Sequence, residues 1–179
     1  MVIKDRTHAL ATQRLELRPL TELDAGFLLD LYADPEVIRY TGESRFRDEQ
    51  EAQSFLARCN AAPPSYPPVY LLRTVGDEKK IGWCGLRYDV VDQVFDLGFR
   101  LHRTAWGKGF ATEASRAVIE EAFGAYGLIR VRARCVRDNL GGSNVLVKLG
   151  FKPGRSFSAH GYLCDEYELQ RHERTIGKN

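Results

Sequence analysis

Hydrophobic and polar residues recur with two different periods along the chain, and the changes of period divide it into strands and helices. Alternation at every second residue over Arg14–Arg18 predicts a half-buried strand. Thr21 and the apolar series after it, which ends at Asp34 and Pro35, predict an N-capped amphipathic helix. A second helix is expected from about Asp48 to Asn60.

The middle of the chain is predicted to be a loop followed by an antiparallel meander. Residues 61 to 68 hold four of the seven prolines, and proline lacks the backbone donor that a helix or a central strand needs. Three strand-like runs separated by turn residues come next. They cover Val69–Thr74, Ile81–Tyr88 and Val94–Leu101.

From Gly109 the hydrophobic period becomes helical and predicts a long helix that ends near residues 124 to 127. The segments after it are predicted as a strand, a shorter helix and a final strand, at Leu128–Val136, Gly142–Leu149 and Tyr162–Leu169. The order is therefore strand, helices, meander, helix, strand, helix, strand.

Composition is that of a soluble globular protein, with 44% hydrophobic and 28% charged residues. The 179 residues suffice for one sizeable core, so we expect a single domain over residues 1–179. The 26 basic and 24 acidic side chains leave a net charge of +2, which excludes a strong overall field toward nucleic acid or an anionic membrane. No signal peptide and no bilayer-spanning run is visible, and we expect a cytoplasmic protein.

The four cysteines and four histidines are scattered, and they predict neither a metal site nor a local Cys/His nucleophile pair. No C-x-x-C pair occurs, so we expect reduced thiols and no bound metal. The cysteines are Cys59, Cys84, Cys135 and Cys164.

A glycine-rich turn between a strand and a helix is the strongest candidate for a ligand site. The strand at Val94–Leu101 leads into the run Trp106-Gly107-Lys108-Gly109-Phe110-Ala111, where the long helix begins. Such a turn exposes successive backbone N–H groups beside the positive end of a helix dipole, and both favour phosphate. Taken alone, it also fits a simple tight connection. The common nucleotide loops G-x-x-x-x-G-K-[ST] and G-x-G-x-x-G are poor fits.

At these residues the sequence resembles the GNAT superfamily of acyl-CoA-dependent N-acetyltransferases. The superfamily signature is [Q/R]-x-x-G-x-[G/A] at the start of the helix after the fourth strand, and Trp106 stands here at the glutamine or arginine position. The form W-G-x-G-[YF]-A-T-E-A is familiar in the branch that includes the ribosomal-protein alanine N-acetyltransferases (RimJ/RimL-like).

Three further segments are similar to the same branch. Asn139 and the run Ser143–Phe151 resemble its N-x-x-S-x-x-V-L-x-K-L-G-F element, although the serine of that element aligns with Gly142. Arg14–Pro19 and Asp34–Val37 also look like the branch, so the resemblance covers about residues 13–170.

The resemblance implies an α/β (α+β) fold with a mixed, mostly antiparallel twisted sheet flanked by helices and splayed where acetyl-CoA enters. It implies that the pyrophosphate lies on the N–H groups of the glycine turn. The pantetheine arm would pair with the exposed strand that precedes this turn, and Asn139 would bind the arm from the other side. The implied cofactor-binding residues are Phe99, Arg100, Leu101, Trp106, Gly107, Lys108, Gly109, Phe110, Ala111, Thr112 and Asn139.

Acetylation of an amine requires that a proton be removed, and Asp96 on the strand before the turn is the candidate base. The alternative is an ordinary strand-face aspartate satisfied by a neighbouring arginine. The N–H of Phe99 is the candidate oxyanion donor. Ser143, near the expected thiol, is the second catalytic candidate.

Arg130, Arg132 and Arg134 share one face of a predicted strand, which we interpret as a solvated or salt-bridged face and not as a nucleic-acid stripe. The function expected from the resemblance is direct acetyl transfer from acetyl-CoA to a primary amine, with a protein N-terminal alanine or serine ahead of a small molecule such as an antibiotic, polyamine or amino-acid analogue. A non-catalytic acyl-CoA sensor is the alternative of another class. The oligomeric state stays open between monomer and homodimer.

Overall fold

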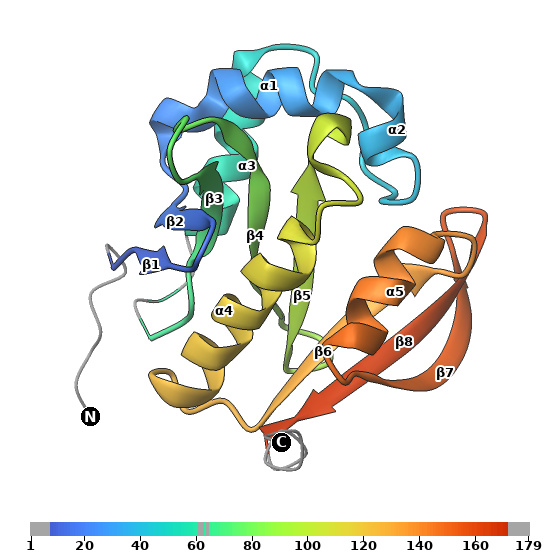
Figure 1. The fold of residues 1–179 in the computed structure, drawn as a ribbon. Helices are drawn as coiled ribbons and strands as arrows, with labels where there is room; N and C mark the ends of the chain where they lie inside the picture. Colours follow the sequence, from blue (N-terminus) through green and yellow to red (C-terminus); the bar gives the residue numbers. More distant parts are fainter. Residues whose placement is uncertain (1–7, 61–62, 64, 172–179) are drawn as a thin grey trace.

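The computed structural model describes residues 8–60, 63 and 65–171, and its framework is one eight-stranded sheet in the order β1-β2-β3-β4-β5-β6-β8-β7 (Figure 1). Neighbouring strands are antiparallel except for β5 and β6, which run parallel. The strands are β1 Leu10–Ala11, β2 Leu15–Pro19, β3 Val69–Thr74, β4 Lys80–Asp89, β5 Val94–Leu101, β6 Arg130–Val136, β7 Lys152–Ala159 and β8 Tyr162–Gln170.

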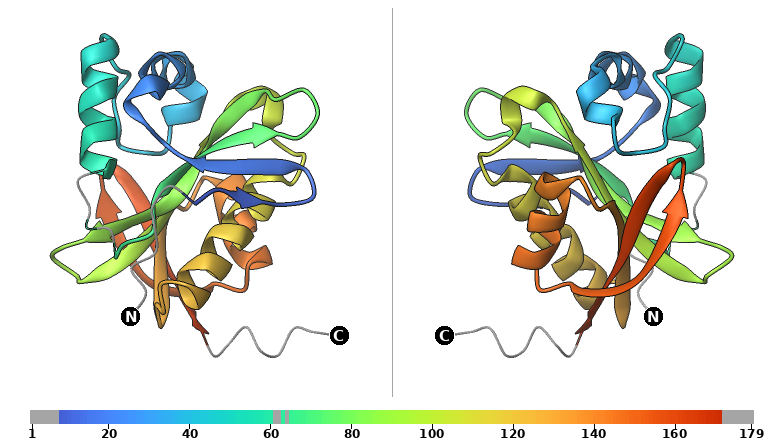
Figure 2. Two further views of the ribbon diagram at one scale, coloured as in Figure 1. Left: turned by 90° about the vertical axis from the view of Figure 1, so that its left-hand side faces the viewer. Right: turned by 90° about the vertical axis from the view of Figure 1, so that its right-hand side faces the viewer.

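Helices cover both faces of this sheet (Figure 2). The first three α-helices pack on one face, and α4 and α5 pack on the other. The helices are η1 Glu22–Asp24, α1 Ala25–Ala33, α2 Pro35–Ile38, α3 Glu49–Asn60, η2 Arg103–Ala105, α4 Phe110–Gly124 and α5 Leu140–Lys148. The predicted fold class, a mixed and mostly antiparallel sheet flanked by helices, is confirmed.

Four elements were not predicted: β1, α2, η2 and β7. The strand β7, with the sequence KPGRSFSA, is the edge strand of the sheet and is exposed along most of its length. Because neither of its faces meets a core, it carries no alternation of apolar residues. Of the predicted loop over residues 61–68, residues 61, 62 and 64 lie outside the described part of the chain.

Two hydrophobic cores hold the helices against the sheet. In α4, the buried residues recur every three or four positions, which is the spacing of one helix face. They are Ala114, Ser115, Val118, Ile119, Ala122 and Phe123. On the opposite face, Trp83 and Tyr32 are fully buried between the sheet and helices α1 and α3. These two cores fix the sheet from both sides. None of the helices in the described ranges is long and apolar enough to cross a membrane.

A cluster of charged side chains joins β4, β5 and β6 at the point where the parallel pair meets. Arg132, only 5% exposed, contacts Asp96 (Nε to Oδ1, 2.6 Å), Asp89 (Nη2 to Oδ2, 2.8 Å) and Asp92. Arg134 pairs with Asp96 and Asp89 as well. The expectation that the arginine-bearing face of this strand is salt-bridged is therefore confirmed, but Arg132 is buried and not solvated.

Candidate functional site

The glycine turn has the conformation that an anion site requires. Gly107 and Gly109 have φ angles of 72° and 81°, in the left-handed region that glycine adopts most readily. Gly109 is the N-cap of α4 and offers no side-chain oxygen, so the N–H groups of the first helical turn have neither a cap nor an intrahelical acceptor. The turn is exposed, and its backbone donors can reach a phosphate.

Arg14 lies beside this turn and was missed from the sequence. Its Nη1 donates to the carbonyl of Lys108 (3.0 Å), and its Nε donates to Glu113 Oε2 (2.7 Å). The guanidinium lies 4.7 Å from the centre of the Phe110 ring. Burial alone would raise the pKa of Glu113, but hydrogen bonds from Thr12 and Arg14 outweigh it and lower that pKa. The ionised Glu113 therefore holds a second positive charge, besides the exposed Lys108, next to the expected pyrophosphate.

Strands β5 and β6 pair at Asp96 and Arg132 and then diverge, as the resemblance implied (Figure 1). The N–H of His102, directly after β5, donates to the carbonyl of Ile81 in β4 (2.9 Å). Alternate residues of a strand direct their backbone groups to opposite edges, so those of Phe99 and Leu101 face the open edge toward β6. An extended ligand can pair with this edge as an additional strand would.

Two side chains already use carbonyls on this edge. Arg100 Nη1 donates to the Phe99 carbonyl (2.7 Å), and the Trp106 indole Nε1 donates to the Leu101 carbonyl (2.8 Å). Trp106 stands at the position of the glutamine or arginine of the signature. Its hydrogen bond connects the glycine turn to the end of β5. The N–H groups of Phe99 and Leu101 are the donors that the edge still offers to a ligand.

Across the splay, α5 places Asn139 at the end of β6. The Asn139 side-chain oxygen caps the helix by accepting from the N–H of Gly142 (3.0 Å). A Cβ at Gly142 would lie 3.0 Å from Cys135 Sγ and 2.8 Å from Asn139 Nδ2, so the serine of the related branch would fit here only after a shift of these side chains. Ser143 donates to the carbonyl of Leu140 in its own helix (3.2 Å). The catalytic role of Ser143 stays a prediction.

Asp96 lies at the apex of the splay, inside the charged cluster. Its Oδ1 accepts from Arg132 Nε, and its Oδ2 accepts from Arg132 Nη2 (3.0 Å) and from Arg134. This is the arrangement of the ion-paired strand-face aspartate that the sequence also allowed. Its role as a base stays a prediction.

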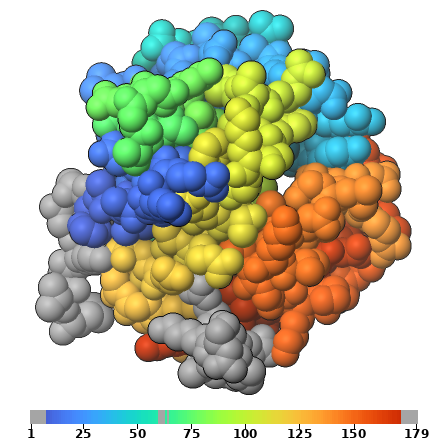
Figure 3. Space-filling model, viewed as in Figure 1, coloured from blue at the N-terminus to red at the C-terminus, as the bar shows by residue number. Residues whose placement is uncertain are grey.

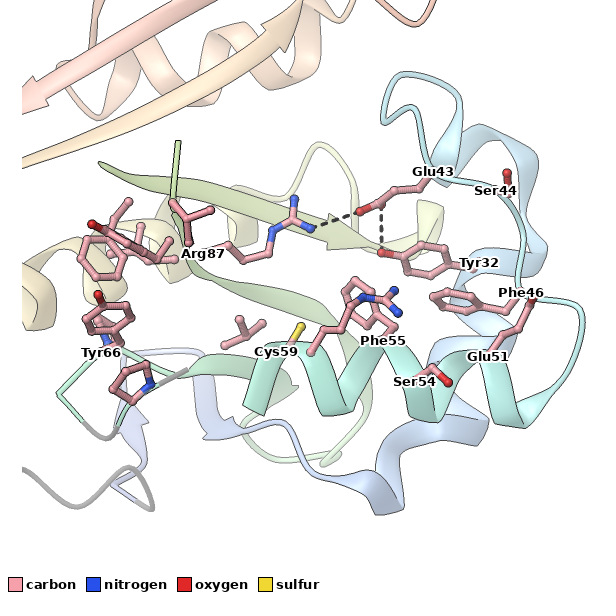
Figure 4. Close-up of a pocket in the computed structure, with 18 of the residues that line it drawn as sticks. Tyr32, Glu43, Ser44, Phe46, Glu51, Ser54, Phe55, Cys59, Tyr66 and Arg87 are labelled. Atoms are coloured by element: carbon pink, nitrogen blue, oxygen red, sulfur yellow. Dashed lines mark hydrogen bonds and ion pairs between the residues drawn. The ribbon is translucent and has the colours of Figure 1, made fainter. Parts of the chain in front are cut away.

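A second carboxylate near the splay, Glu43, was not found from the sequence. It accepts from the Tyr32 hydroxyl (3.0 Å) and from Arg87 Nη1 (3.4 Å) (Figure 4). It also accepts from Arg100 Nη2 (3.1 Å). Burial and the charge of Glu43 raise the pKa of Tyr32, which keeps that hydroxyl a donor. Glu43 lies in the loop between α2 and α3, which has no regular pattern, so only the packing of this loop against β5 reveals it.

Glu43 lines a groove of about 890 Å³ between α3 and the end of β4. Tyr66 lies at one end of it, and Ser44 and Phe46 lie at the other (Figure 4). Its walls are largely aromatic, from Phe46, Phe55, Tyr66, Tyr88 and Phe95. Its charged lining residues are Glu43, Arg45, Glu51, Arg58 and Arg87.

These features fit acetyl-CoA. Free N–H groups at the turn suit the pyrophosphate, and the open β5 edge suits the pantetheine amides. The turn before α4 and the helix α5 lie next to each other on one face of the molecule (Figure 3). Among the residues described, no group of three or more His, Cys, Asp or Glu side chains could hold a metal ion.

Comparisons with known proteins agree with this geometry. The sequence profile described as "Acetyltransferase (GNAT) domain" matches residues 14–152. The N-acetyltransferase p20 of Bacillus licheniformis is 31% identical over 166 residues, which cover 88% of this chain and 92% of that protein. The FsC-acetyl coenzyme A-N(2)-transacetylase of Aspergillus fumigatus is 28% identical, with 83% of this chain and 66% of that protein covered.

Among solved structures, the RimL ribosomal L7/L12 α-N-protein acetyltransferase in complex with coenzyme A has the same fold. Its TM-score is 0.78 at 15% identity, and the match covers 91% of this chain and 98% of that one. The resemblance at the glycine turn is thereby confirmed at the level of the whole domain. The chain belongs to the GNAT superfamily of N-acetyltransferases.

Proposed function

We propose that the protein transfers the acetyl group of acetyl-CoA directly to the N-terminal amine of a protein or peptide that begins with alanine or serine. The observation that supports this proposal is a chain of contacts that links the open edge of β5 to an exposed groove. The open edge of β5 at Phe99 contacts Arg100, Arg100 contacts Glu43, and Glu43 lines a groove whose outer residues Ser44 and Ser54 are exposed. Such a groove leaves room for a chain that continues beyond the reacting amine.

Acetyl-CoA supplies an activated acetyl thioester. The chain's own residues would bind the cofactor, orient the amine and remove its proton. The turn from Trp106 to Thr112 would bind the pyrophosphate, with Lys108 and Arg14 beside it. The Phe99 N–H is the proposed oxyanion donor. Burial raises the pKa of Cys135 to about 11, so its thiol stays protonated. This supports transfer without an acyl-cysteine intermediate. The four free cysteines are consistent with a reducing cytoplasm.

A small-molecule amine is the second candidate acceptor. The groove volume of about 890 Å³ is within the range of small-molecule sites. One relative is named as a coenzyme A-N(2)-transacetylase. The lining of the groove does not require that the acceptor be a peptide chain.

The acceptor is tested by an amine panel. We expect release of free thiol from acetyl-CoA with alanine- and serine-initiated peptides, and little with internal lysine, because an N-terminal amine has a pKa near 8 whereas a lysine side chain has one of about 10.4. The same assay covers a polyamine, an aminoglycoside and an amino-acid analogue. Turnover of small amines alone would reject the peptide acceptor, and binding of coenzyme A without any thiol release would favour a sensor module.

Two carboxylates compete for the role of proton acceptor, and we place Glu43 ahead of Asp96 because Glu43 lines the groove. Glu43→Gln is expected to lower kcat about a hundredfold at neutral pH, with partial recovery at high pH, as general-base loss does. Coenzyme A affinity, measured by calorimetry, should remain nearly unchanged.

Asp96→Asn is the matched variant, since it also replaces one carboxylate by an amide. We expect it to reduce stability through the Arg132 cluster more than it alters the pH–rate profile. If folded Asp96→Asn instead shows the larger loss of kcat and the flattened pH–rate profile, the base is Asp96 and Glu43 only positions Arg100.

A further inference from the structure

The arginines that face the groove differ from one another in their partners. Most arginines in the described part of the chain form ion pairs, among them Arg87 with Glu43 and Arg47 with Glu51. Arg45 and Arg58 also line the groove, and the side chain of neither forms a hydrogen bond or ion pair with any residue that the structure describes. These two positive charges are therefore available to a ligand.

The helix α3 presents one continuous face to the groove. The lining residues of this helix recur at intervals of three and four, which places them along a single stripe. They are Glu51, Ser54, Phe55, Arg58 and Cys59. Arg58 therefore lines the groove from the helix α3. Arg45 lines it from the loop between α2 and α3, which also contains Glu43.

The charges of the groove do not balance. Glu43 is already engaged by Arg87 and Arg100, and Glu51 by Arg47, whose side chain is largely exposed. Arg45 and Arg58 therefore leave an excess of positive charge in a groove whose walls are aromatic. The reacting amine would approach Glu43, the proposed base. An anionic group of the same acceptor would bind Arg45 and Arg58, so it must be separated from the amine within the acceptor.

We propose, on the basis of the proposed function, that the groove selects acceptor peptides in which an aspartate or glutamate follows closely after the acetylated N-terminal residue. The carboxylate is bound by Arg45 and Arg58, and an apolar or aromatic neighbour packs against rings such as Phe55 and Tyr66. A guanidinium suits this task because its fork of donors matches a carboxylate.

The test compares peptides that differ only in charge. The series Ala-Phe-Xaa-Gly-amide and Ala-Xaa-Phe-Gly-amide, with aspartate, asparagine or lysine at Xaa, keeps the N-terminal amine and the length constant. We expect kcat/KM to be about tenfold higher for aspartate than for asparagine in at least one series, as a charged hydrogen bond would give. Lysine should be the poorest.

The double variant Arg45→Gln/Arg58→Gln should bring the aspartate-to-asparagine ratio close to one. The control is Arg116→Gln, which removes one positive charge, half of the charge lost in the double variant, from an exposed position of α4 that does not line the groove. It should keep the full ratio. Equal kcat/KM for aspartate and asparagine peptides in the unmodified protein, or a ratio retained by the double variant, would reject the anion site.

A second series separates this inference from the proposed function. The small amines para-aminomethylbenzoate and para-aminomethylbenzamide differ in a carboxylate far from the amine. If only these are acetylated, the peptide acceptor is wrong, whereas a preference for the benzoate that disappears in the double variant would still support Arg45 and Arg58 as the anion site. If nothing is acetylated, binding of acetylated aspartate and asparagine peptides, measured by fluorescence anisotropy with coenzyme A present, decides the anion site alone.

Discussion

Gly109→Val is expected to abolish binding of coenzyme A, because it removes the backbone conformation on which the proposed phosphate site depends. Gly109 has a φ of 81°, a value that a β-branched residue adopts only under strain. Its added side chain would also approach Arg14 Nη2, since a Cβ there lies 3.4 Å from that atom. The turn must rearrange, and the N–H groups of Phe110 to Thr112 lose their common direction. Calorimetry should detect no binding at concentrations that saturate the unmodified protein.

Gly26→Val is the matched control for this change. Gly26 lies in α1 with an ordinary helical backbone, and a Cβ there has no neighbour within 4 Å. It should bind coenzyme A normally. If Gly109→Val folds, as judged by circular dichroism, and binds coenzyme A as tightly as Gly26→Val, the phosphate site is not at this turn.

Arg132→Met should lower the free energy of unfolding by about 3 kcal/mol, because it removes the buried cation of a carboxylate cluster and leaves only the more exposed Arg134 to pair with Asp89 and Asp96. Asp96 and Asp89 are only 13% and 18% exposed, and both pair with the Arg132 guanidinium. Hydrogen bonds to Asp96 and its neighbours raise the pKa of Arg132 above its already high value, so the charge is permanent. The measurement is urea denaturation followed by tryptophan fluorescence.

Arg134→Met is the comparison, since Arg134 pairs with the same two aspartates but is 42% exposed. Its loss should cost about 1 kcal/mol or less. Arg132→Lys keeps the charge without the planar fork and should fall between the two, which keeps the test usable if Arg132→Met does not fold. Equal losses for Arg132→Met and Arg134→Met would show that burial of the cluster contributes nothing.

Most of the fold could be predicted from the sequence, since each prediction depended on local patterns. The strands Val69–Thr74 and Val94–Leu101 have the bounds of the strand-like runs that predicted them, and α4 begins directly after Gly109, where the helical period begins. The glycine turn is equally local, because Gly107 and Gly109 adopt the left-handed backbone within a few residues of each other. Elements without a hydrophobic period, such as the edge strand β7, gave no such signal.

The sequence by itself therefore determined the order of the main elements, the family and the position of the glycine turn, because these depend on residues close together in the chain. Only the tertiary structure decided which charged groups meet. The backbone N–H of Arg14 bonds to Glu113 99 positions away, and Arg100 bonds to Glu43 57 positions away. Alternation placed the arginines of β6 on one face, but the parallel pairing of β5 with β6 selected Arg132 for Asp96. Contacts between distant segments depend on the order in which the strands pair in the sheet. The hydrophobic pattern of one segment does not indicate which other segment it will contact.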